Sequence, residues 1–312
     1  MTASEKNPSI KDQRPGSLQI WLQAARPKTL WAAVAPVMMG SSMAYAAGGF
    51  HAGAAGAALA CALLIQIGTN FCNDYADFKK GADTADRIGP VRATQAGWVT
   101  PAHMRRATVL TFALAAGVWL YLVYRGGWPM LVIGIVSIAA GVLYTAGPYA
   151  LAYLGLGDLF VLIFFGPVAV GGTYFAQTGT LSSSVLWAGL APGCLSCAIL
   201  VVNNLRDIQQ DRAAGKRTLA VRFGPRFARA EYLVTVFVPL VVVPTILWRG
   251  HNQSPLIGLV ALSGMIGIRP IFAIIQGQSG ITLNPALGQT ARMLLVYAML
   301  FTFVHYSATL SL

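Results

Sequence analysis

Long apolar stretches alternate with shorter polar segments along most of this chain. Most of the stretches are long enough for a helix to cross the roughly 30 Å hydrocarbon core of a bilayer. They lack the period-2 alternation that strands of a transmembrane barrel show, so we expect helices. Glycine pairs such as Gly126-Gly127 separate neighbouring stretches. The pattern predicts nine membrane-spanning helices, at residues 30–48, 54–73, 107–124, 129–146, 158–176, 185–203, 232–248, 255–275 and 292–311.

The composition excludes a soluble globular protein. Hydrophobic residues make up 56% of the 312 positions, and charged residues make up only 10%. Soluble domains carry roughly 25% charged residues, because their surface must face water. We therefore expect an all-α, polytopic membrane protein whose helices surround a central cavity open to the cytoplasmic side. Residues 17–312 are expected to form a single transmembrane domain, and residues 1–16 a flexible cytoplasmic tail.

The basic residues predict the orientation in the membrane. The formal net charge is +12, and 18 of the 22 lysines and arginines lie before the first span or in the loops at 74–106 and 204–231. These three segments share one side of a nine-span chain, and the positive-inside rule makes that side cytoplasmic. We expect a multi-pass protein of the cell (inner or plasma) membrane, with a cytoplasmic N-terminus and an external C-terminus. The excess charge is assigned to orientation and to anionic lipid headgroups rather than to nucleic acid, and no obligate protein partner is indicated.

The four cysteines are Cys61, Cys72, Cys194 and Cys197, and all lie within or beside apolar stretches. The spacing Cys194-x-x-Cys197 is typical of redox or zinc sites, but no second pair of cysteines or histidines accompanies it. We therefore interpret all four as small packing residues.

Acidic residues are scarce and concentrated. Six of the ten lie in the segments 74–86 and 207–211. Both segments begin at the predicted cytoplasmic ends of spans and lead into basic loops. Carboxylates are costly near a bilayer and usually mark function. A cation-coupled transporter remains a distant alternative, although its acids would be expected nearer the middle of the membrane.

The spacing within both segments favours a metal site. Residues four apart share a helix face, so Asn73 and Asp77 should project together, as should Asn203, Asp207 and Asp211. Carboxylates this close repel one another unless a cation lies between them. A ligand set made only of oxygen atoms favours a hard cation, with Mg²⁺ ahead of Ca²⁺ or Mn²⁺.

Basic side chains are interleaved with these acids. Mg²⁺ in proteins is typically held by a few carboxylates together with substrate phosphates, and arginine and lysine bind phosphate oxygens well. The combination predicts a diphosphate site. The alternative is that the charges only solvate helix ends and form salt bridges. The interleaved cations are Lys79, Lys80, Arg87, Arg92, Arg206, Lys216 and Arg217.

The two acidic segments, Asn73-Asp74-x-x-Asp77 and Asp207-x-x-x-Asp211, resemble the aspartate-rich motifs of the UbiA-type intramembrane prenyltransferases. The similarity is closest to the branch that acts on 1,4-dihydroxy-2-naphthoate in menaquinone biosynthesis, and it runs from about residue 20 to the last span. Further motifs of that branch are Arg26-Pro27-Lys28-Thr29-Leu30, Lys80-Gly81-Ala82-Asp83-Thr84, Gly89-Pro90-x-Arg92-Ala93, Tyr144-Thr145-x-Gly147-Pro148, Leu154-Gly155-Leu156-Gly157-Asp158, Asn203-Asn204-x-Arg206-Asp207 and Gly215-Lys216-Arg217-Thr218-Leu219-Ala220-Val221.

The resemblance implies a reaction. A polyprenyl group would pass from its diphosphate to the naphthoate, with loss of CO₂ and diphosphate, to give demethylmenaquinol. Another aromatic acceptor such as 4-hydroxybenzoate or homogentisate, or a haem-related acceptor, is the alternative within the family. The implied cofactor is Mg²⁺, and the implied partners are the polyprenyl diphosphate, the naphthoate and membrane lipid.

The resemblance also implies residue roles. One position departs from the wider family: many members carry an acid where this chain has Gly81, and the next carboxylate is Asp83, whose role stays open. Asp158 either caps the fifth span or contacts the acceptor. The implied catalytic residues are Asn73, Asp77, Asp207 and Asp211; these four would bind Mg²⁺, with Asp74 and Asn203 in support; Lys80, Arg92, Lys216 and Arg217 would bind diphosphate; and Arg26, Lys28 and Tyr144 would bind the acceptor.

Overall fold

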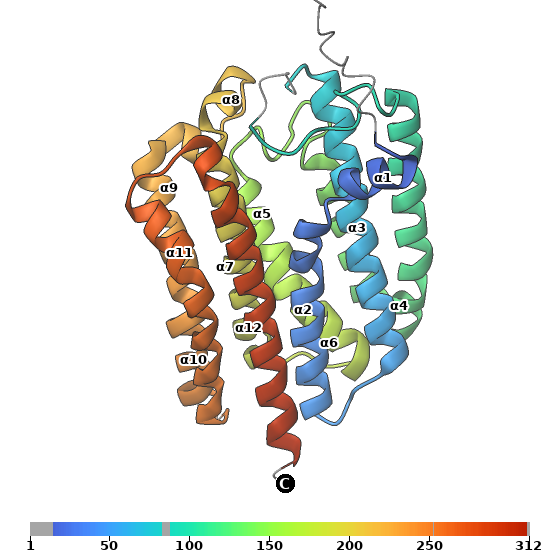
Figure 1. Cartoon of the computed structure of the whole chain (residues 1–312). Helices are drawn as coiled ribbons and strands as arrows, with labels where there is room; N and C mark the ends of the chain where they lie inside the picture. The colour runs from blue at the N-terminus through green and yellow to red at the C-terminus, as the bar shows by residue number, and fades with distance from the viewer. Residues whose placement is uncertain (1–14, 83–87, 252, 311–312) are drawn as a thin grey trace, which may run out of the picture.

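The computed structural model describes residues 15–82, 88–251 and 253–310, with side chains to residue 308. All regular elements in these residues are helical, which confirms the all-α prediction (Figure 1). The α-helices are α1 (Ser17–Ala25), α2 (Pro27–Ala46), α3 (Ala52–Lys79), α4 (Pro101–Leu143), α5 (Gly157–Ile163), α6 (Ala169–Thr178), α7 (Ser183–Arg206), α8 (Ile208–Ala213), α9 (Leu219–Phe237), α10 (Val243–Gly250), α11 (Gly264–Ile275) and α12 (Asn284–Leu310). Two π-helical turns, η2 (Phe164–Val168) and η3 (Val238–Val242), and two 3₁₀ segments, η4 (Pro255–Ser263) and η5 (Gly280–Leu283), complete the chain.

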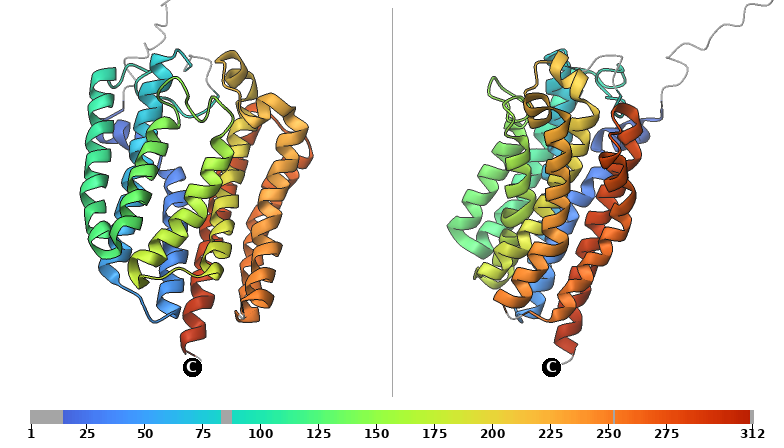
Figure 2. Two further views of the ribbon diagram at one scale, coloured as in Figure 1. Left: turned by 180° about the vertical axis from the view of Figure 1, so that it is seen from behind. Right: turned by 90° about the vertical axis from the view of Figure 1, so that its left-hand side faces the viewer.

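The long helices run side by side as a bundle (Figures 1 and 2). One end carries α1, α8 and the connections that contain the acidic segments, and the C-terminus lies at the other end. The last helix, α12, packs against α2 and α7, while α3 packs against α2 and α4. Segments far apart in the sequence therefore meet around a common interior.

Seven helical segments of the described chain are long and apolar enough to cross a membrane. One of them is α4, which covers two of the predicted spans, and α2 is outside the seven. The chain is thus a multi-pass membrane protein, while the total of nine spans stays a prediction.

The two halves of α4 form an antiparallel hairpin. Gly127 has φ 67° and ψ −154°, which is not helical and is open to glycine. Beyond it the chain turns back, and the Trp119 indole N–H donates to the Met130 carbonyl at 2.6 Å. A side chain at Gly134 would meet the Trp119 ring, and a side chain at Gly141 would meet the Phe112 ring. Going seven residues forward in the second half therefore goes seven residues back in the first half, as in an antiparallel pair. The predicted break at Gly126-Gly127 is confirmed.

Local signals explain where several helices begin. Thr100 caps α4 by accepting from the backbone N–H of His103, and Pro101 occupies the first helical position. Thr218 caps α9 in the same way, accepting from Val221. These caps fix the entry of each helix beside the acidic segments.

The short helix α1 was not predicted. It buries Ile20 and Ala24 and exposes Leu18 and Leu22, and Trp21 packs edge-on against Phe71 of α3. The expected tail at residues 1–16 lies almost entirely outside the described residues. The packing role predicted for the cysteines is confirmed, because all four are buried and unbridged.

Candidate functional site

A cavity of about 390 Å³ lies inside the bundle between α2, α3, both halves of α4, α5 to α6 and α7. One stripe of α3 lines it from Asp77 to Ala58. At 1.5 Å per residue this stripe is about 28 Å long. Its deep end is apolar and includes Leu122 and Met130, next to the α4 hairpin. The other end carries the charged residues of both acidic segments.

Asn73 and Asp77 both line the cavity, so their predicted common face on α3 is confirmed. Asp77 is 2% exposed, and three groups converge on its carboxylate. Arg92 Nη2 lies 3.4 Å and Lys216 Nζ 3.3 Å from Oδ2, while the Tyr153 hydroxyl donates to Oδ1 at 3.0 Å. Two cationic side chains thus balance the charge of this buried carboxylate. Asp77 is the point at which the two segments meet.

The second segment is organised by Arg206, which is 3% exposed. Its Nε and Nη2 donate to the two carboxylate oxygens of Asp207 at 2.7 and 2.6 Å, a bidentate pair. Nη2 also donates to Asn203 Oδ1 at 2.8 Å, and Nη1 to Asn284 Oδ1 at 3.0 Å. This arginine therefore fixes the segment and joins the end of α7 to the start of α12.

The predicted continuous helical stripe through Asn203, Asp207 and Asp211 is interrupted. The helix breaks at Asp207, with α7 ending at Arg206 and α8 beginning at Ile208. The backbone N–H of Asp211 still donates to the Asp207 carbonyl at 2.8 Å, and all three side chains line the cavity. Lys216 Nζ lies 4.0 Å from Asp211 Oδ1, so this lysine stands between the aspartates of both segments.

Both segments end in the same backbone motif. Gly81 and Gly215 have φ of 67° and 73°. The following N–H groups, of Ala82 and Lys216, donate back to the carbonyls of Asp77 and Asp211 at 2.9 and 2.8 Å. This is the Schellman arrangement of a helix C-terminus. Each aspartate is thereby anchored through its own main chain.

Gly215→Ala is expected to lower the free energy of unfolding by about 1–2 kcal/mol, because alanine resists a left-handed conformation. It should also reduce turnover, since Lys216 and Asp211 share the distorted turn. Gly179→Ala is the matched control, with a φ of 71°, open space and a position away from the cavity. Thermal unfolding and initial rates check this; equal rates in the two variants would contradict it.

Asp74 lies away from the cavity. Its two carboxylate oxygens each accept one backbone N–H, from Ala93 and Thr94, at 3.0 Å. It is 2% exposed and does not line the cavity. The structure uses this carboxylate to hold the loop that carries Arg92.

Three of the implied cations also lie outside the cavity lining, whereas Arg92 and Lys216 line it. Lys80 Nζ donates to the carbonyls of Thr145 and Gly147 at 2.7 and 3.0 Å and lies 4.1 Å from the Tyr153 ring centroid. Burial lowers the pKa of the Lys80 ammonium, and the Asp77 carboxylate opposes that shift. Lys28 and Arg217 are exposed.

Two of the three implied acceptor residues, Arg26 and Tyr144, line the cavity. Arg26 joins α1 to α2 with φ 54°, the single positive φ outside glycine in the described residues. Its carbonyl accepts from the Thr29 N–H and hydroxyl, both at 2.9 Å. Such a conformation costs about 1 kcal/mol and is typical of functional sites.

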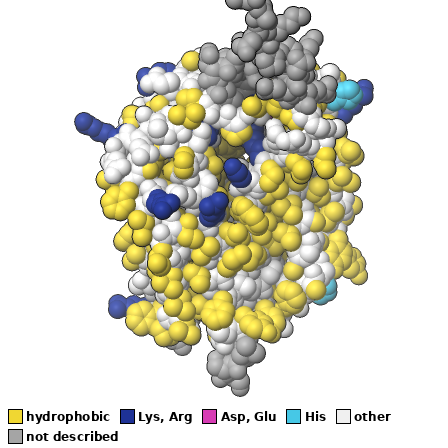
Figure 3. Space-filling view, in the orientation of Figure 1, with side chains coloured by type: hydrophobic (Ala, Val, Ile, Leu, Met, Phe, Trp, Pro, Cys, Tyr) yellow, Lys and Arg dark blue, Asp and Glu magenta, His cyan; other side chains and the backbone are white. Residues whose placement is uncertain are grey.

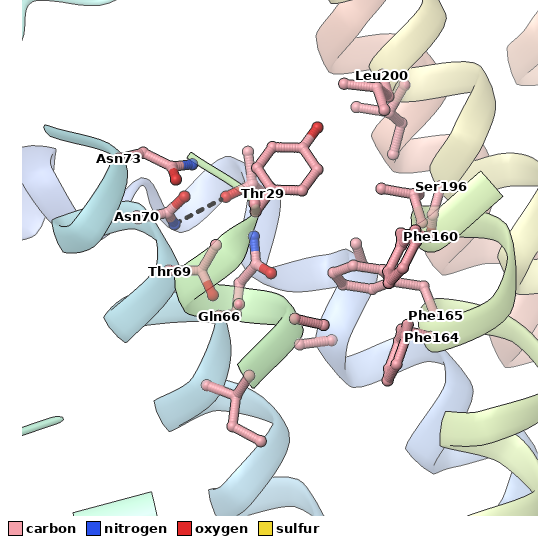
Figure 4. A pocket seen from close by; sticks show the side chains of 18 of the residues that line it. Thr29, Gln66, Thr69, Asn70, Asn73, Phe160, Phe164, Phe165, Ser196 and Leu200 are labelled. Atoms are coloured by element: carbon pink, nitrogen blue, oxygen red, sulfur yellow. Dashed lines mark hydrogen bonds between the residues drawn. The ribbon is translucent and has the colours of Figure 1, made fainter. Parts of the chain in front are cut away.

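A polar wall that was not predicted from the sequence lies deeper along α3. Asn70 bonds to Thr29 and to the Ala25 carbonyl, whereas no described residue bonds to the side chains of Gln66 or Thr69. Across the cavity Ser196 is 4% exposed, and no described residue bonds to its buried hydroxyl. Figure 4 shows the α3 side chains facing Phe160, Phe164 and Phe165 of the opposite wall. Asn70, Thr69 and Gln66 lie three, four and seven residues before Asn73, and this helical spacing was the available signal.

Asp158 lies in the first turn of α5, beside Cys197 of α7 and Glu231 of α9. Ligand-type atoms of the three lie within 4.8 Å of one another, and none of the three lines the cavity. Gly157, the residue before Asp158, lies close to the Tyr144 hydroxyl, since a side chain at Gly157 would be 3.2 Å from that oxygen. Asp83 is outside the described residues.

The residues at the charged end fit Mg²⁺. Asn73, Asp77, Asn203, Asp207 and Asp211 offer carboxylate and amide oxygens as ligands at this end, and no described lining residue is a histidine or cysteine. Hard cations prefer such a set. The aspartates are balanced by Arg92, Lys216 and Arg206, whose guanidinium and ammonium groups suit phosphate oxygens.

The model of the UbiA prenyltransferase family matches residues 33–279, most of the chain. The chain belongs to the UbiA prenyltransferase family. It is therefore a prenyltransferase, as the resemblance of its two acidic segments implied.

Curated relatives within this family are similar over nearly their full length. The 1,4-dihydroxy-2-naphthoate octaprenyltransferase of Haemophilus influenzae is 33% identical over 91% of this chain and 95% of its own. The enzymes of that name from Escherichia coli and Mycobacterium tuberculosis are 35% and 38% identical, over 94% and 89% of this chain and 96% and 94% of their own.

Solved structures of the family share the fold. A UbiA homolog from Archaeoglobus fulgidus bound to DMAPP and Mg²⁺ has a TM-score of 0.64 at 15% identity, covering 94% of this chain and 99% of that one. An apo UbiA homolog from Aeropyrum pernix K1 has a TM-score of 0.66 at 16% identity, covering 89% and 96%. At these identities the likeness establishes the fold.

Proposed function

We propose that this chain transfers a polyprenyl group from a polyprenyl diphosphate to 1,4-dihydroxy-2-naphthoate, with release of CO₂ and diphosphate. The observation that carries the proposal is the convergence of both acidic segments and their three cations on the charged end of one long cavity. The near full-length similarity to naphthoate octaprenyltransferases supports the choice of acceptor.

The charged end suits the diphosphate. Asn73, Asp77, Asn203, Asp207 and Asp211 would hold Mg²⁺, which when bound neutralises charge on the leaving group. Arg92 and Lys216, now paired with Asp77, would bind diphosphate oxygens and stabilise the negative charge that grows as the C–O bond breaks. Lys80 would act indirectly, by holding the 145–147 turn and the Tyr153 ring.

The middle of the cavity suits the aromatic acceptor. Gln66, Thr69 and Ser196 offer polar atoms for its hydroxyl groups, and the facing phenylalanines offer stacking surface. Arg26 would orient the carboxylate, and the Tyr144 ring would face the allylic cation. The apolar deep end, with Leu122 and Met130, would receive the first part of the prenyl tail.

The overall reaction places few demands on proton transfer. The ring gains a prenyl cation and loses its carboxylate as CO₂, and the leaving diphosphate carries away the remaining charge. Charge therefore balances without a net proton when the acceptor enters as the carboxylate. A site whose carboxylates are already paired with cations suits such a reaction.

We further propose that residues 17–312 act as one transmembrane unit whose charged end faces the cytoplasm. Eighteen basic residues lie on the side of the acidic segments, whereas Arg125 and Arg249 lie at the opposite end. The positive-inside rule assigns the side rich in basic residues to the cytoplasm.

The test uses the purified full chain in detergent with Mg²⁺, a polyprenyl diphosphate and one of three acceptors: the naphthoate, 4-hydroxybenzoate or homogentisate. CO₂ release and prenylated product are measured. Product from the naphthoate alone is expected. Product from another acceptor alone would overturn the acceptor assignment, and no product from any of the three acceptors in folded protein would overturn the proposal.

Metal removal gives a separate prediction. A chelator should reduce the rate to background, because the paired carboxylates then lack the cation that shields the diphosphate. Adding Mg²⁺ in excess of the chelator should restore it. A rate unchanged by the chelator would contradict the metal assignment while leaving the acceptor assay intact.

A further inference from the structure

Two arginines are exposed on apolar helices and lie outside the cavity lining. Arg269 of α11 and Arg292 of α12 are both exposed, and each lies inside a segment apolar enough to span a membrane. Neither lines the cavity. Charged side chains in such segments are costly and normally face the interior or pair with an acid. An outward-facing pair therefore calls for a counter-charge.

The two arginines lie at the same level. α11 and α12 are packed antiparallel, and a side chain at Gly267 would lie 2.7 Å from Met293 Sδ. Arg269, two residues beyond Gly267, is thus level with residue 291, next to Arg292. At 1.5 Å per residue, Arg269 lies about 9 Å along the helix axis from Ile275, the last residue of α11. Arg292 lies about 12 Å from Asn284, the first residue of α12.

Within the described residues, no acid pairs with these two arginines. The last acidic residue in the chain is Glu231, so α11 and α12 contain none. Glu231 itself belongs to the cluster with Asp158 and Cys197. No described residue forms an ion pair with either arginine. Figure 3 shows Lys and Arg side chains set in the largely hydrophobic face of the bundle, with no carboxylate visible there.

A third arginine lies at the connection above them. Arg229 of α9 donates from Nη2 to the Gly277 carbonyl at 3.1 Å, and its buried Nε finds no hydrogen-bond partner in the part of the chain that the structure describes. The surroundings are apolar: Met265, Ile268 and Phe272 share the exposed face of α11 with Arg269, and Met299 and Phe303 are exposed on α12. Charged groups thus lie above a surface suited to acyl chains.

We propose that Arg269 and Arg292, with Arg229 above them, bind the phosphate headgroup of an anionic phospholipid. Guanidinium groups match phosphate geometry, and their aliphatic stems can lie along apolar helix surface while the charge reaches the headgroup region. Anionic lipids are enriched in the cytoplasmic leaflet, to which the acidic segments are assigned. The site is independent of prenyl transfer.

The test compares full-length wild type with R269Q/R292Q in phosphatidylcholine nanodiscs, with and without phosphatidylglycerol. Phosphatidylglycerol should raise the Tm of the wild type, and native mass spectrometry should detect bound lipid. The double variant should lose at least half of the shift and most of the bound lipid. R249Q is the matched control, because Arg249 is exposed at the other end, over the Trp248 ring at 5.3 Å.

Equal shifts and equal bound lipid in wild type and R269Q/R292Q would overturn the proposal, as would an equal loss in R249Q. If the double variant fails to fold, the single variants R269Q and R292Q are used; each should lose part of the shift, and R269K should retain it. Geranyl diphosphate should leave the bound phosphatidylglycerol in place. Its displacement by geranyl diphosphate would overturn the lipid assignment in favour of a second site for substrate.

Discussion

Replacing Asp77 with asparagine is expected to lower turnover roughly 10³-fold, the upper range for removing one electrostatic group from an active site. The carboxylate faces the cavity and pairs with Arg92 and Lys216, which come from loops after α3 and after α8. Asparagine keeps the shape but removes the charge that would hold both the metal and these cations. Initial rates at saturating Mg²⁺ and substrates measure the loss.

Asp74→Asn is the matched control for Asp77→Asn, because it makes the same chemical change three residues earlier. Its carboxylate serves the backbone of Ala93 and Thr94. Asp74→Asn should therefore act mainly on stability, seen as a lower Tm, and only weakly on the rate. Asp211→Asn should repeat the effect of Asp77→Asn. Turnover within tenfold of wild type in both Asp77→Asn and Asp211→Asn would contradict a mechanism that needs both acidic segments.

Arg206→Gln is expected to destabilise the protein by about 3–5 kcal/mol and to abolish most activity. Removing one partner of a buried ion pair leaves the other charge uncompensated, here the carboxylate of Asp207. The variant also loses the bond to Asn203 within α7 and the bond to Asn284, which joins α7 to α12. Thermal unfolding and the Mg²⁺ dependence of the rate measure the two effects.

Arg206→Lys separates charge from geometry, because a lysine keeps the charge but cannot reproduce the four donated bonds. It should recover little activity. Arg212→Gln is the control, since Arg212 is exposed on the neighbouring helix. If Arg206→Gln matched Arg212→Gln in both Tm and rate, the organising role of Arg206 would be wrong.

Spacing was sufficient to predict the common face of Asn73 and Asp77, because a helix of known period fixes which side chains project together. It could not separate Asp74 from Asp77. The difference depends on where the loop at 93–94 returns, and that is a long-range contact. The same limit applies to Lys80 and Lys216, since only the folded chain brings the second of them beside Asp77.

The break in α4 was predictable from Gly126-Gly127, whereas the break at Asp207 was not. Glycine pairs change the backbone locally, but Asp207 leaves the helix without any glycine or proline at that position. Arg206 was noted as one of several cations near the second segment. Its role depends on Asn284, which is 78 residues away. The polar wall of Gln66 and Thr69 was overlooked because neutral side chains do not interrupt an apolar stretch.

The shared ending of the two acidic segments limits where this chain can change length. Asp77 and Asp211 are each four residues before a left-handed glycine, and their main-chain carbonyls accept the closing bond. An extra residue between aspartate and glycine would rotate one relative to the other by about 100° about the helix axis. The carboxylate would then leave the cavity, or the turn would open. Insertions and deletions should accordingly be rejected within the four-residue intervals and directly after each glycine, where the N–H groups of Ala82 and Lys216 close the turns.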